Sequence, residues 1–370
     1  MHAGRIHAGR AERAGGGPVF VVGSMRSGST MLRLILDSHP EIAIGPETGF
    51  MRGLRGAKEI PNWQHGKGWY ERLGWSESEF DARLDDFYDG IFRRFATEQG
   101  KTRWGEKTPF HTTCIPEMAK VFPTATFVGI VRQPGAVATS LHKHFHYTFA
   151  DAVSYWLATN LDLVRAGSEL GTRFAVCRYE DLVLHAEPVL RAAMQHLDES
   201  WSSDLLEHHR VQREKGAPRR AEGSTVTREP IDASHVDEWA SSMGAGQRQA
   251  LSSVAELGLF FGYDVLDPES HRPLPANLDE RQWLLTGEDL AKRRVEWADR
   301  IDFELRPPTL TIEASPQELA SQLARAEQAL ARVRSRRSVR LVDAFRRLQH
   351  GRSASDLRDV WAVLRKQRDP

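Results

Sequence analysis

The sequence predicts an α/β fold in which helices cover a central parallel sheet. Three short apolar segments, residues 18–22, 125–131 and 173–177, are each followed by a stretch with helical spacing. Alternation of strand and helix along the chain is typical of parallel sheets. Parallel sheets bind ligands at the carboxyl ends of their strands, so we expect the functional residues there.

The composition is that of a globular protein. The 370 residues include 50 Lys and Arg against 50 Asp and Glu, and 40% are hydrophobic. Neutrality disfavours a nucleic-acid binder. The two cysteines, Cys114 and Cys177, exclude a disulfide scaffold and a four-cysteine zinc site, and they suit a reducing compartment. Short apolar runs and an Arg-, His- and Gly-rich start predict no membrane span and no secretory signal, hence a cytoplasmic protein.

Charge and proline placement divide the chain into four parts. We expect a disordered segment (1–17), a main domain (18–268), an irregular extension with short helices (269–314) and a basic helical tail (315–370). The tail holds 13 Lys and Arg against 6 Asp and Glu, a net charge of +7. Its apolar residues follow two heptads, which suits a short coiled coil that pairs subunits in a homodimer, with packing on the core as the alternative. Its arginine-rich part suits peripheral membrane contact, with a solvated helix as the alternative.

The strongest local signal is the segment VGSMRSGST at residues 22–30, between a strand and a helix. Gly23 and Gly28 permit a tight turn and close approach of a ligand. Backbone N–H groups at a helix N-terminus attract anions. Ser29 and Thr30 add hydroxyl donors, and Arg26 adds a fixed positive charge. We therefore predict an anion-binding loop, with a tight turn that binds nothing as the alternative.

Two departures weigh against ATP hydrolysis. The nucleotide-triphosphatase loop needs a lysine before its last Ser or Thr, where this chain has Ser29. The strand at 125–131 ends in Arg132 rather than in an aspartate that could hold magnesium. A P-loop kinase-like phosphotransferase using ATP stays the second hypothesis. A non-enzymatic scaffold that acts through the basic tail is the third.

Three motifs in order resemble the sulfotransferases that use 3′-phosphoadenosine 5′-phosphosulfate (PAPS). Residues 25–30 are similar to their 5′-phosphosulfate loop. Residues 127–134, with Ser140 eight positions after Arg132, are similar to their 3′-phosphate motif, and RYEDL at 178–182 is similar to a segment near the nucleotide. The resemblance implies a three-layer, P-loop-like α/β domain with a helical C-terminal extension. It also implies PAPS as co-substrate and no metal.

The resemblance also assigns residues to the donor. The implied donor-binding residues are Arg26, Ser27, Gly28, Ser29, Thr30, Arg132, Ser140, Tyr179 and Ser224. Arg132 and Ser140 would hold the 3′-phosphate by a charge-assisted fork and a hydroxyl. Ser224 lies in a loop that would fold over the nucleotide. Tyrosylprotein-type members have a lysine before a downstream tryptophan; Glu238 stands there, so an arginine of the loop is the candidate substitute.

Transfer of a sulfuryl group needs cations for the transferring group and a base for the acceptor proton. Arg26 and Lys107 are the candidate cations. Glu47 is the candidate base, because tyrosylprotein and some glycan sulfotransferases have a glutamate at this position just after the second strand. His111 is the competing base, since cytosolic small-molecule sulfotransferases use a histidine. His142, His144 and His146 alternate, but a helix would separate them, which disfavours a metal site.

The acceptor is the part that the sequence specifies least. Residues 50–100 are rich in Trp, Tyr and Phe, whose faces suit sugars, phenols and apolar scaffolds, although core packing is the ordinary explanation. Tyrosylprotein-type members have an arginine two residues after the base that helps hold an acidic peptide. Gly49 stands there. We therefore expect a hydroxyl on a glycan, a glycolipid or a small molecule.

Overall fold

A computed structural model describes residues 16–59, 63–145, 147–216, 229–233, 236, 238–241, 243–265 and 282–306. The chain divides into two units, Met1–Thr309 and Leu310–Pro370, and all described residues belong to the first. No described helix is long and apolar enough to cross a membrane. The predicted basic tail and the first 15 residues lie outside the described part, so their predicted character stays a prediction.

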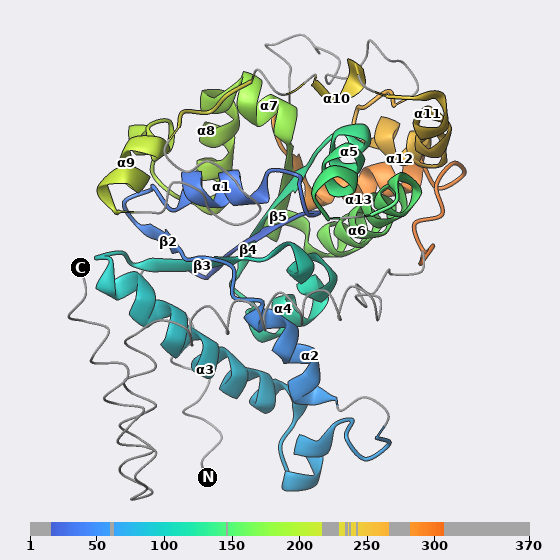
Figure 1. Ribbon diagram of the computed structural model, residues 1–370. Helices are drawn as coiled ribbons and strands as arrows, with labels where there is room; N and C mark the ends of the chain where they lie inside the picture. The colour runs from blue at the N-terminus through green and yellow to red at the C-terminus, as the bar shows by residue number, and fades with distance from the viewer. Residues whose placement is uncertain are drawn as a thin grey trace, which may run out of the picture. The chain divides into compact units, whose positions relative to one another are not determined.

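The first unit is built on a six-stranded sheet with the order β2-β3-β1-β4-β5-β6 (Figure 1). The strands are β1 (Val19–Val22), β2 (Ile42–Ile44), β3 (Arg103–Lys107), β4 (Thr126–Val131), β5 (Phe174–Arg178) and β6 (Leu285–Thr286). The first five pair in parallel, and β6 adds an antiparallel edge. The predicted α/β class with a central parallel sheet is confirmed.

Helices cover both faces of the sheet, so the fold has three layers (Figure 1). Alternate residues of a strand point to opposite faces, and in β1 Val19 and Val21 pack on one side and Phe20 and Val22 on the other. One face is covered by α1 (Ser29–Leu36), α7 (Tyr179–Leu184) and α8 (Ala186–Leu197). The other is covered by α3 (Glu77–Glu98), α4 (Ile115–Val121), α5 (Pro134–Phe145) and α6 (Phe149–Leu170).

The remaining elements are short. The other α-helices are α2 (Gly53–Lys58), α9 (His208–Glu214), α10 (Glu238–Ser241), α11 (Ala245–Leu251), α12 (Ala255–Phe260) and α13 (Gly287–Glu296). The 3-10 helices are η2 (Phe50–Arg52), η3 (Trp69–Leu73), η4 (Pro109–Cys114), η5 (Gly171–Arg173), η6 (Ser203–Leu205) and η8 (Ser252–Val254).

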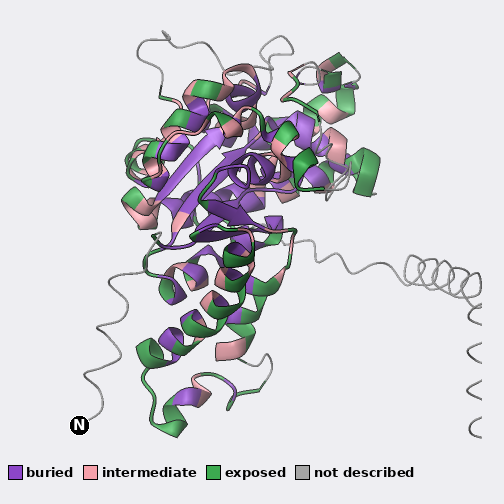
Figure 2. Cartoon of the chain, turned by 90° about the vertical axis from the view of Figure 1, so that its left-hand side faces the viewer, coloured by how far each residue is buried: buried purple, intermediate pink, exposed green. Residues whose placement is uncertain are grey.

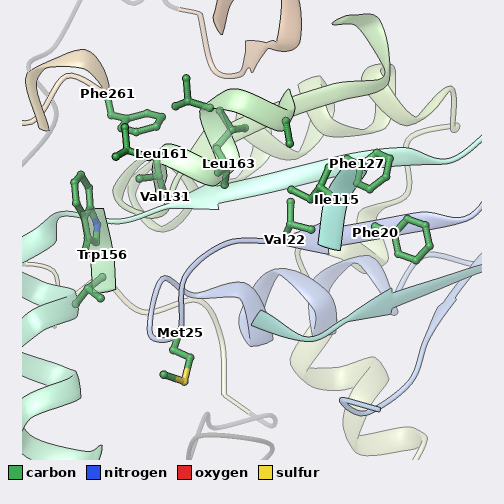
Figure 3. Packing of buried hydrophobic residues seen from close by; sticks show 14 of the residues in the cluster. Phe20, Val22, Met25, Ile115, Phe127, Val131, Trp156, Leu161, Leu163 and Phe261 are labelled. Atoms are coloured by element: carbon green, nitrogen blue, oxygen red, sulfur yellow. The ribbon is translucent and has the colours of Figure 1, made fainter. Parts of the chain in front are cut away.

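Aromatic and aliphatic side chains pack together in the larger core, and Phe20, Phe127, Trp156 and Phe261 are among those drawn in Figure 3. The Phe20 ring lies 5.3 Å from that of Phe127 and 5.8 Å from that of Trp104, and Phe92 of α3 stacks on Trp104 at 4.8 Å. Burial coloured along the chain shows β1, β2 and β3 buried throughout and the outer helix faces exposed (Figure 2). Burial of so much aromatic surface holds the sheet rigid beneath the site.

Strand β3 was not predicted, because its sequence RWGEK carries three charges. All five of its residues are nevertheless buried. Arg103 donates to the carbonyls of Gly17 and Leu197 at 2.6 Å each and pairs with Glu199 at 3.0 Å. Buried charges are tolerated where such partners satisfy them. Pattern reasoning on hydrophobicity cannot detect such a strand.

Part of the extension expected at 269–314, an irregular segment with short helices, lies within the described residues. There Thr286 and Asp289 form a capping box that starts the short helix α13, and β6 pairs with β5. A Cβ at Gly287 would lie 2.3 Å from the Gly167 carbonyl oxygen, so α13 packs tightly on α6. This part therefore completes the main domain. A two-residue strand has no sequence signal of its own.

Candidate active site

The predicted anion-binding loop connects β1 to α1 at the carboxyl edge of the sheet. Gly23 has φ 151° and Gly28 has φ 98°, and a Cβ at Gly28 would lie 2.4 Å from Cδ2 of Tyr179. Arg26 has φ 66°, a left-handed conformation that is strained for a residue with a side chain. Strain of this kind is concentrated at functional sites, and the loop supports the start of α1.

Two residues that the motif analysis missed hold this loop. The N–H of Gly23 donates to Oγ1 of Thr112 at 2.9 Å, and the N–H of Met25 donates to the hydroxyl of Tyr155 at 3.0 Å. Burial raises the pKa of Tyr155 to about 12, so the hydroxyl stays protonated. Thr112 and Tyr155 lie 89 and 130 residues from their partners, and no local pattern marks them.

Arg26, Arg132, Ser140 and Tyr179 form one cluster beside the loop. Nε of Arg26 donates to Oγ of Ser140 at 2.7 Å, and Nη1 of Arg132 donates to the Arg26 carbonyl at 3.2 Å. The Arg132 guanidinium lies 4.1 Å from the Tyr179 ring centre. Arg26, the candidate for both the transferring group and donor binding, therefore lies in direct contact with Ser140, the candidate for the 3′-phosphate.

This cluster is electrostatically suited to an anion. Burial lowers the pKa of Arg26, and the nearby charge of Arg132 lowers it further. Nε of Arg132 is buried and has no hydrogen-bond partner among the described residues. An unsatisfied buried donor is costly. A phosphate oxygen would satisfy it and offset the repulsion between the two guanidinium groups.

Glu47 and Lys107 meet at the ends of neighbouring strands. Lys107 ends β3 with its side chain fully buried, and Glu47 follows β2 with its side chain 28% exposed. The Lys107 ammonium forms an ion pair with the Glu47 carboxylate and donates to Oγ1 of Thr30 at 2.9 Å. Because Thr30 lies in the first turn of α1, this contact connects the pair to the anion-binding loop.

A buried carboxylate, Glu106, fixes the segments that carry this pair. Its Oε1 accepts from the hydroxyls of Thr48 and Thr108 at 2.9 Å each. Its Oε2 contacts Nδ1 of His111 at 2.5 Å. Thr48 follows Glu47 and Thr108 follows Lys107, so Glu106 sets the geometry of both candidates. His111, the competing base, is 1% exposed and held in this network.

A second buried carboxylate, Glu180, supports the end of β4 next to Arg132. It accepts from the N–H of Gln133 at 3.1 Å and from the hydroxyl of Tyr263 at 2.6 Å. Gln133 follows Arg132 directly, so this contact fixes the backbone that carries the guanidinium. Burial raises the pKa of Glu180.

The other residues predicted from the sequence lie in different places in the structure. Ser27 and Ser29 are buried within the loop, and Ser27 donates to the Ser24 carbonyl at 2.7 Å. Ser224 and His146 lie outside the described residues. Nδ1 of the exposed His142 contacts the Tyr147 carbonyl at 2.7 Å. Among the described residues, no group of three or more His, Cys, Asp or Glu could hold a metal ion.

Comparison with known proteins identifies the family. Residues 18–203 match the model described as the sulfotransferase family. Protein-tyrosine sulfotransferase 1 of Danio rerio is 24% identical over 72% of this chain and 78% of its own length. The human protein-tyrosine sulfotransferase 1 is 23% identical over 73% of this chain and 76% of its own length.

Solved structures of sulfotransferases are also similar to this chain. A sulfotransferase domain from the curacin biosynthetic pathway has a TM-score of 0.46 at 19% identity, covering 64% of this chain and 97% of that one. The mouse sulfotransferase SULT7A1, complexed with PAP, has a TM-score of 0.40 at 14% identity, covering 65% of this chain and 84% of that one. The match of the family model covers half of the chain, and the chain belongs to the sulfotransferase family. The prediction of a sulfotransferase enzyme is confirmed.

Proposed function

We propose that this enzyme transfers the sulfuryl group of PAPS to an acceptor hydroxyl, with Glu47 as general base. The observation that carries the proposal is the position of Thr30. Thr30 lies in the first turn of α1, at the end of the anion-binding loop. Its hydroxyl accepts a hydrogen bond from the Lys107 ammonium, which also pairs with Glu47. A donor bound at the loop would therefore have its sulfur next to both candidates.

The cluster of Arg26 and Arg132 supports donor binding. The loop from Ser27 to Thr30 would hold the 5′-phosphosulfate at the start of α1, where backbone N–H groups favour anions. Arg132, whose buried Nε has no partner among the described residues, would bind the 3′-phosphate together with Ser140. Tyr179 lies under the Arg132 guanidinium and would line the nucleotide site. Ser224 stays a proposed donor contact outside the described residues.

The residues of the acceptor side would then carry out proton transfer. Glu47 takes the proton of the acceptor hydroxyl while that oxygen forms its bond to sulfur. The bond between sulfur and the phosphate oxygen breaks, and 3′-phosphoadenosine 5′-phosphate (PAP) leaves with its electron pair. Lys107 and Arg26 stabilise the negative charge on the sulfuryl and bridging oxygens. Because Lys107 contacts the Glu47 carboxylate, it also fixes the base in position.

The ATP-dependent alternative is not favoured. β4 ends in Val131, and Arg132 rather than an acidic residue follows it. Calorimetry without magnesium separates the two hypotheses. Tight PAP binding, weak ATP binding and a large loss in Arg132→Ala would support the donor site. Preference for ATP would overturn it, and PAP binding without any transfer would favour a scaffold.

Replacement of the base is the direct test of chemistry. We expect Glu47→Gln to lower kcat by about 100- to 10,000-fold, the usual contribution of a general base, with PAP affinity little changed. Glu71→Gln, a change at an exposed glutamate of the same region, is the control and should retain full activity. Retention of kcat in Glu47→Gln would exclude it as the base.

The acceptor, the cellular location and the oligomeric state are proposed in less detail. The relatives are named for tyrosine transfer, so a phenolic hydroxyl joins glycan, glycolipid and small-molecule hydroxyls as a candidate acceptor. The cytoplasmic location, the peripheral membrane contact and the homodimer rest on the sequence, and the tail that suggested the last two lies outside the described residues.

A further inference from the structure

We propose that Phe50 and Phe110 form the rim of the acceptor site and select acceptors whose hydroxyl is carried by a flat, apolar body. This inference rests on the proposed function and names its substrate class. Phe50 stands three residues after Glu47, and Phe110 stands three residues after Lys107. Their exposed fractions are 37% and 36%.

The two rings are held on a common frame. Glu106 accepts from Thr48 and Thr108 at 2.9 Å each, and the N–H of Gly49 donates to Oγ1 of Thr108 at 3.1 Å. These bonds connect the segment that leads to Phe50 with the segment that leads to Phe110. Both rings are therefore fixed relative to the Glu47 carboxylate before any acceptor arrives, which lowers the entropic cost of binding.

Each ring is also in contact with a neighbouring side chain. Phe50 lies 4.7 Å from Tyr88 and 6.0 Å from Phe87 of α3, ring centre to ring centre. The Tyr88 hydroxyl donates to the Phe50 carbonyl at 3.1 Å. The Arg52 guanidinium lies 5.8 Å from the ring centre of Phe110. A partly exposed aromatic ring that is packed on one side presents its free surface to a ligand.

The residues next to Glu47 in the sequence favour an apolar acceptor, while the exposed Arg52 stands beside Phe110. Lys107 is fully buried, so an acceptor must approach Glu47 from its exposed side. Its exposed neighbours in the sequence include Pro46, Thr48 and Phe50, and the Thr48 hydroxyl already donates to Glu106. Gly49 offers no side chain. An apolar ring that covers this surface would also exclude water from the transferring group.

The test compares three acceptors with PAPS as donor: 2-naphthol, methyl glucoside and a tyrosyl peptide with acidic flanks. We expect the wild type to prefer 2-naphthol in kcat/KM. Phe110→Ala and Phe50→Leu should each lower kcat/KM for 2-naphthol by about tenfold, the effect of losing one aromatic contact, mainly through KM. Phe50→Leu keeps apolar packing against α3 while removing the flat face.

Controls separate this inference from the proposed function. Trp63→Ala, which removes an exposed ring of the same region, should change nothing. PAP affinity should be unchanged in all variants, so a wild type that binds no PAP would contradict the proposed donor rather than the rim. Preference for methyl glucoside or the acidic peptide, no turnover of 2-naphthol, or unchanged KM in both Phe variants would overturn the rim.

Discussion

The two halves of the site each stand on a buried carboxylate, and the two carboxylates act on different parts of the chain. Glu106 binds the side chains of Thr48, Thr108 and His111, next to the proposed base and cation. Glu180 binds the backbone N–H of Gln133 and the hydroxyl of Tyr263. The comparison indicates that the proposed acceptor half is positioned through side chains, whereas the proposed donor half is positioned through the backbone that follows β4.

Among the changes that test this comparison, Glu106→Gln has the largest expected effect. An amide in place of the carboxylate loses a charge-assisted bond worth about 1.5–3 kcal/mol, which corresponds to about 10- to 100-fold in rate if it is lost in the transition state. We expect kcat to fall by that factor at saturating PAPS, with PAP affinity unchanged. Glu98→Gln on the exposed end of α3 is the control. An equal loss of PAP affinity in Glu106→Gln would contradict the proposed difference between Glu106 and Glu180.

Glu180→Gln should act on the donor instead. Displacement of the backbone at Gln133 would move Arg132, and we expect PAP to bind about tenfold more weakly, or about 1.4 kcal/mol. The kcat at saturating PAPS should be nearly unchanged. Calorimetry with PAP and steady-state kinetics measure the two quantities, with Glu187→Gln of α8 as the control. A fall in kcat with normal PAP affinity would contradict the assignment.

Tyr263→Phe sharpens the same comparison at smaller scale. It removes one of the two donors to Glu180 and leaves the Gln133 bond in place. The net value of one such bond is about 1 kcal/mol, so we expect PAP affinity to fall by about threefold to fivefold. Calorimetry with PAP measures the effect. An effect larger than that of Glu180→Gln would show that Tyr263 acts independently of this carboxylate.

Lys101 is also buried but lies apart from Glu106 and Glu180. We expect it to affect stability and not catalysis. Lys101 donates to the carbonyls of Asp37 at 2.5 Å and Ile42 at 2.6 Å. Burial lowers its pKa from 10.5 to about 7, with Asp37 opposing and Lys215 adding to the shift. Between these values the unfolded chain binds more protons than the folded one, so this group makes stability rise with pH from about 7 upward.

Lys101→Met removes that dependence. Urea unfolding of the wild type should give a higher free energy of unfolding at pH 9 than at pH 7. This increase should be smaller in Lys101→Met, and kcat should be the same in both proteins. The exposed Lys143→Met is the matched control and should retain the wild-type slope. Equal slopes in all three proteins would mean that Lys101 stays charged when buried.

The sequence predicted the donor half of the site better than the acceptor half. Arg26, Ser140, Arg132 and Tyr179 belong to contiguous motifs, and the structure brings them together. The frame around Glu106 is assembled from separate segments, and β3, which carries it, has no apolar pattern. Long-range partners such as Thr112 and Tyr155 were missed for the same reason, since only folding brings them to the loop.

The left-handed backbone of Arg26 has a consequence for engineering. A side chain at φ 66° costs about 1–2 kcal/mol, which glycine would not incur. A screen that selects this protein for heat resistance alone would therefore favour glycine at position 26 and remove a guanidinium of the proposed donor site. Thermostable variants should be selected with Arg26 kept unchanged, because this residue lowers stability while its guanidinium has the proposed role in catalysis.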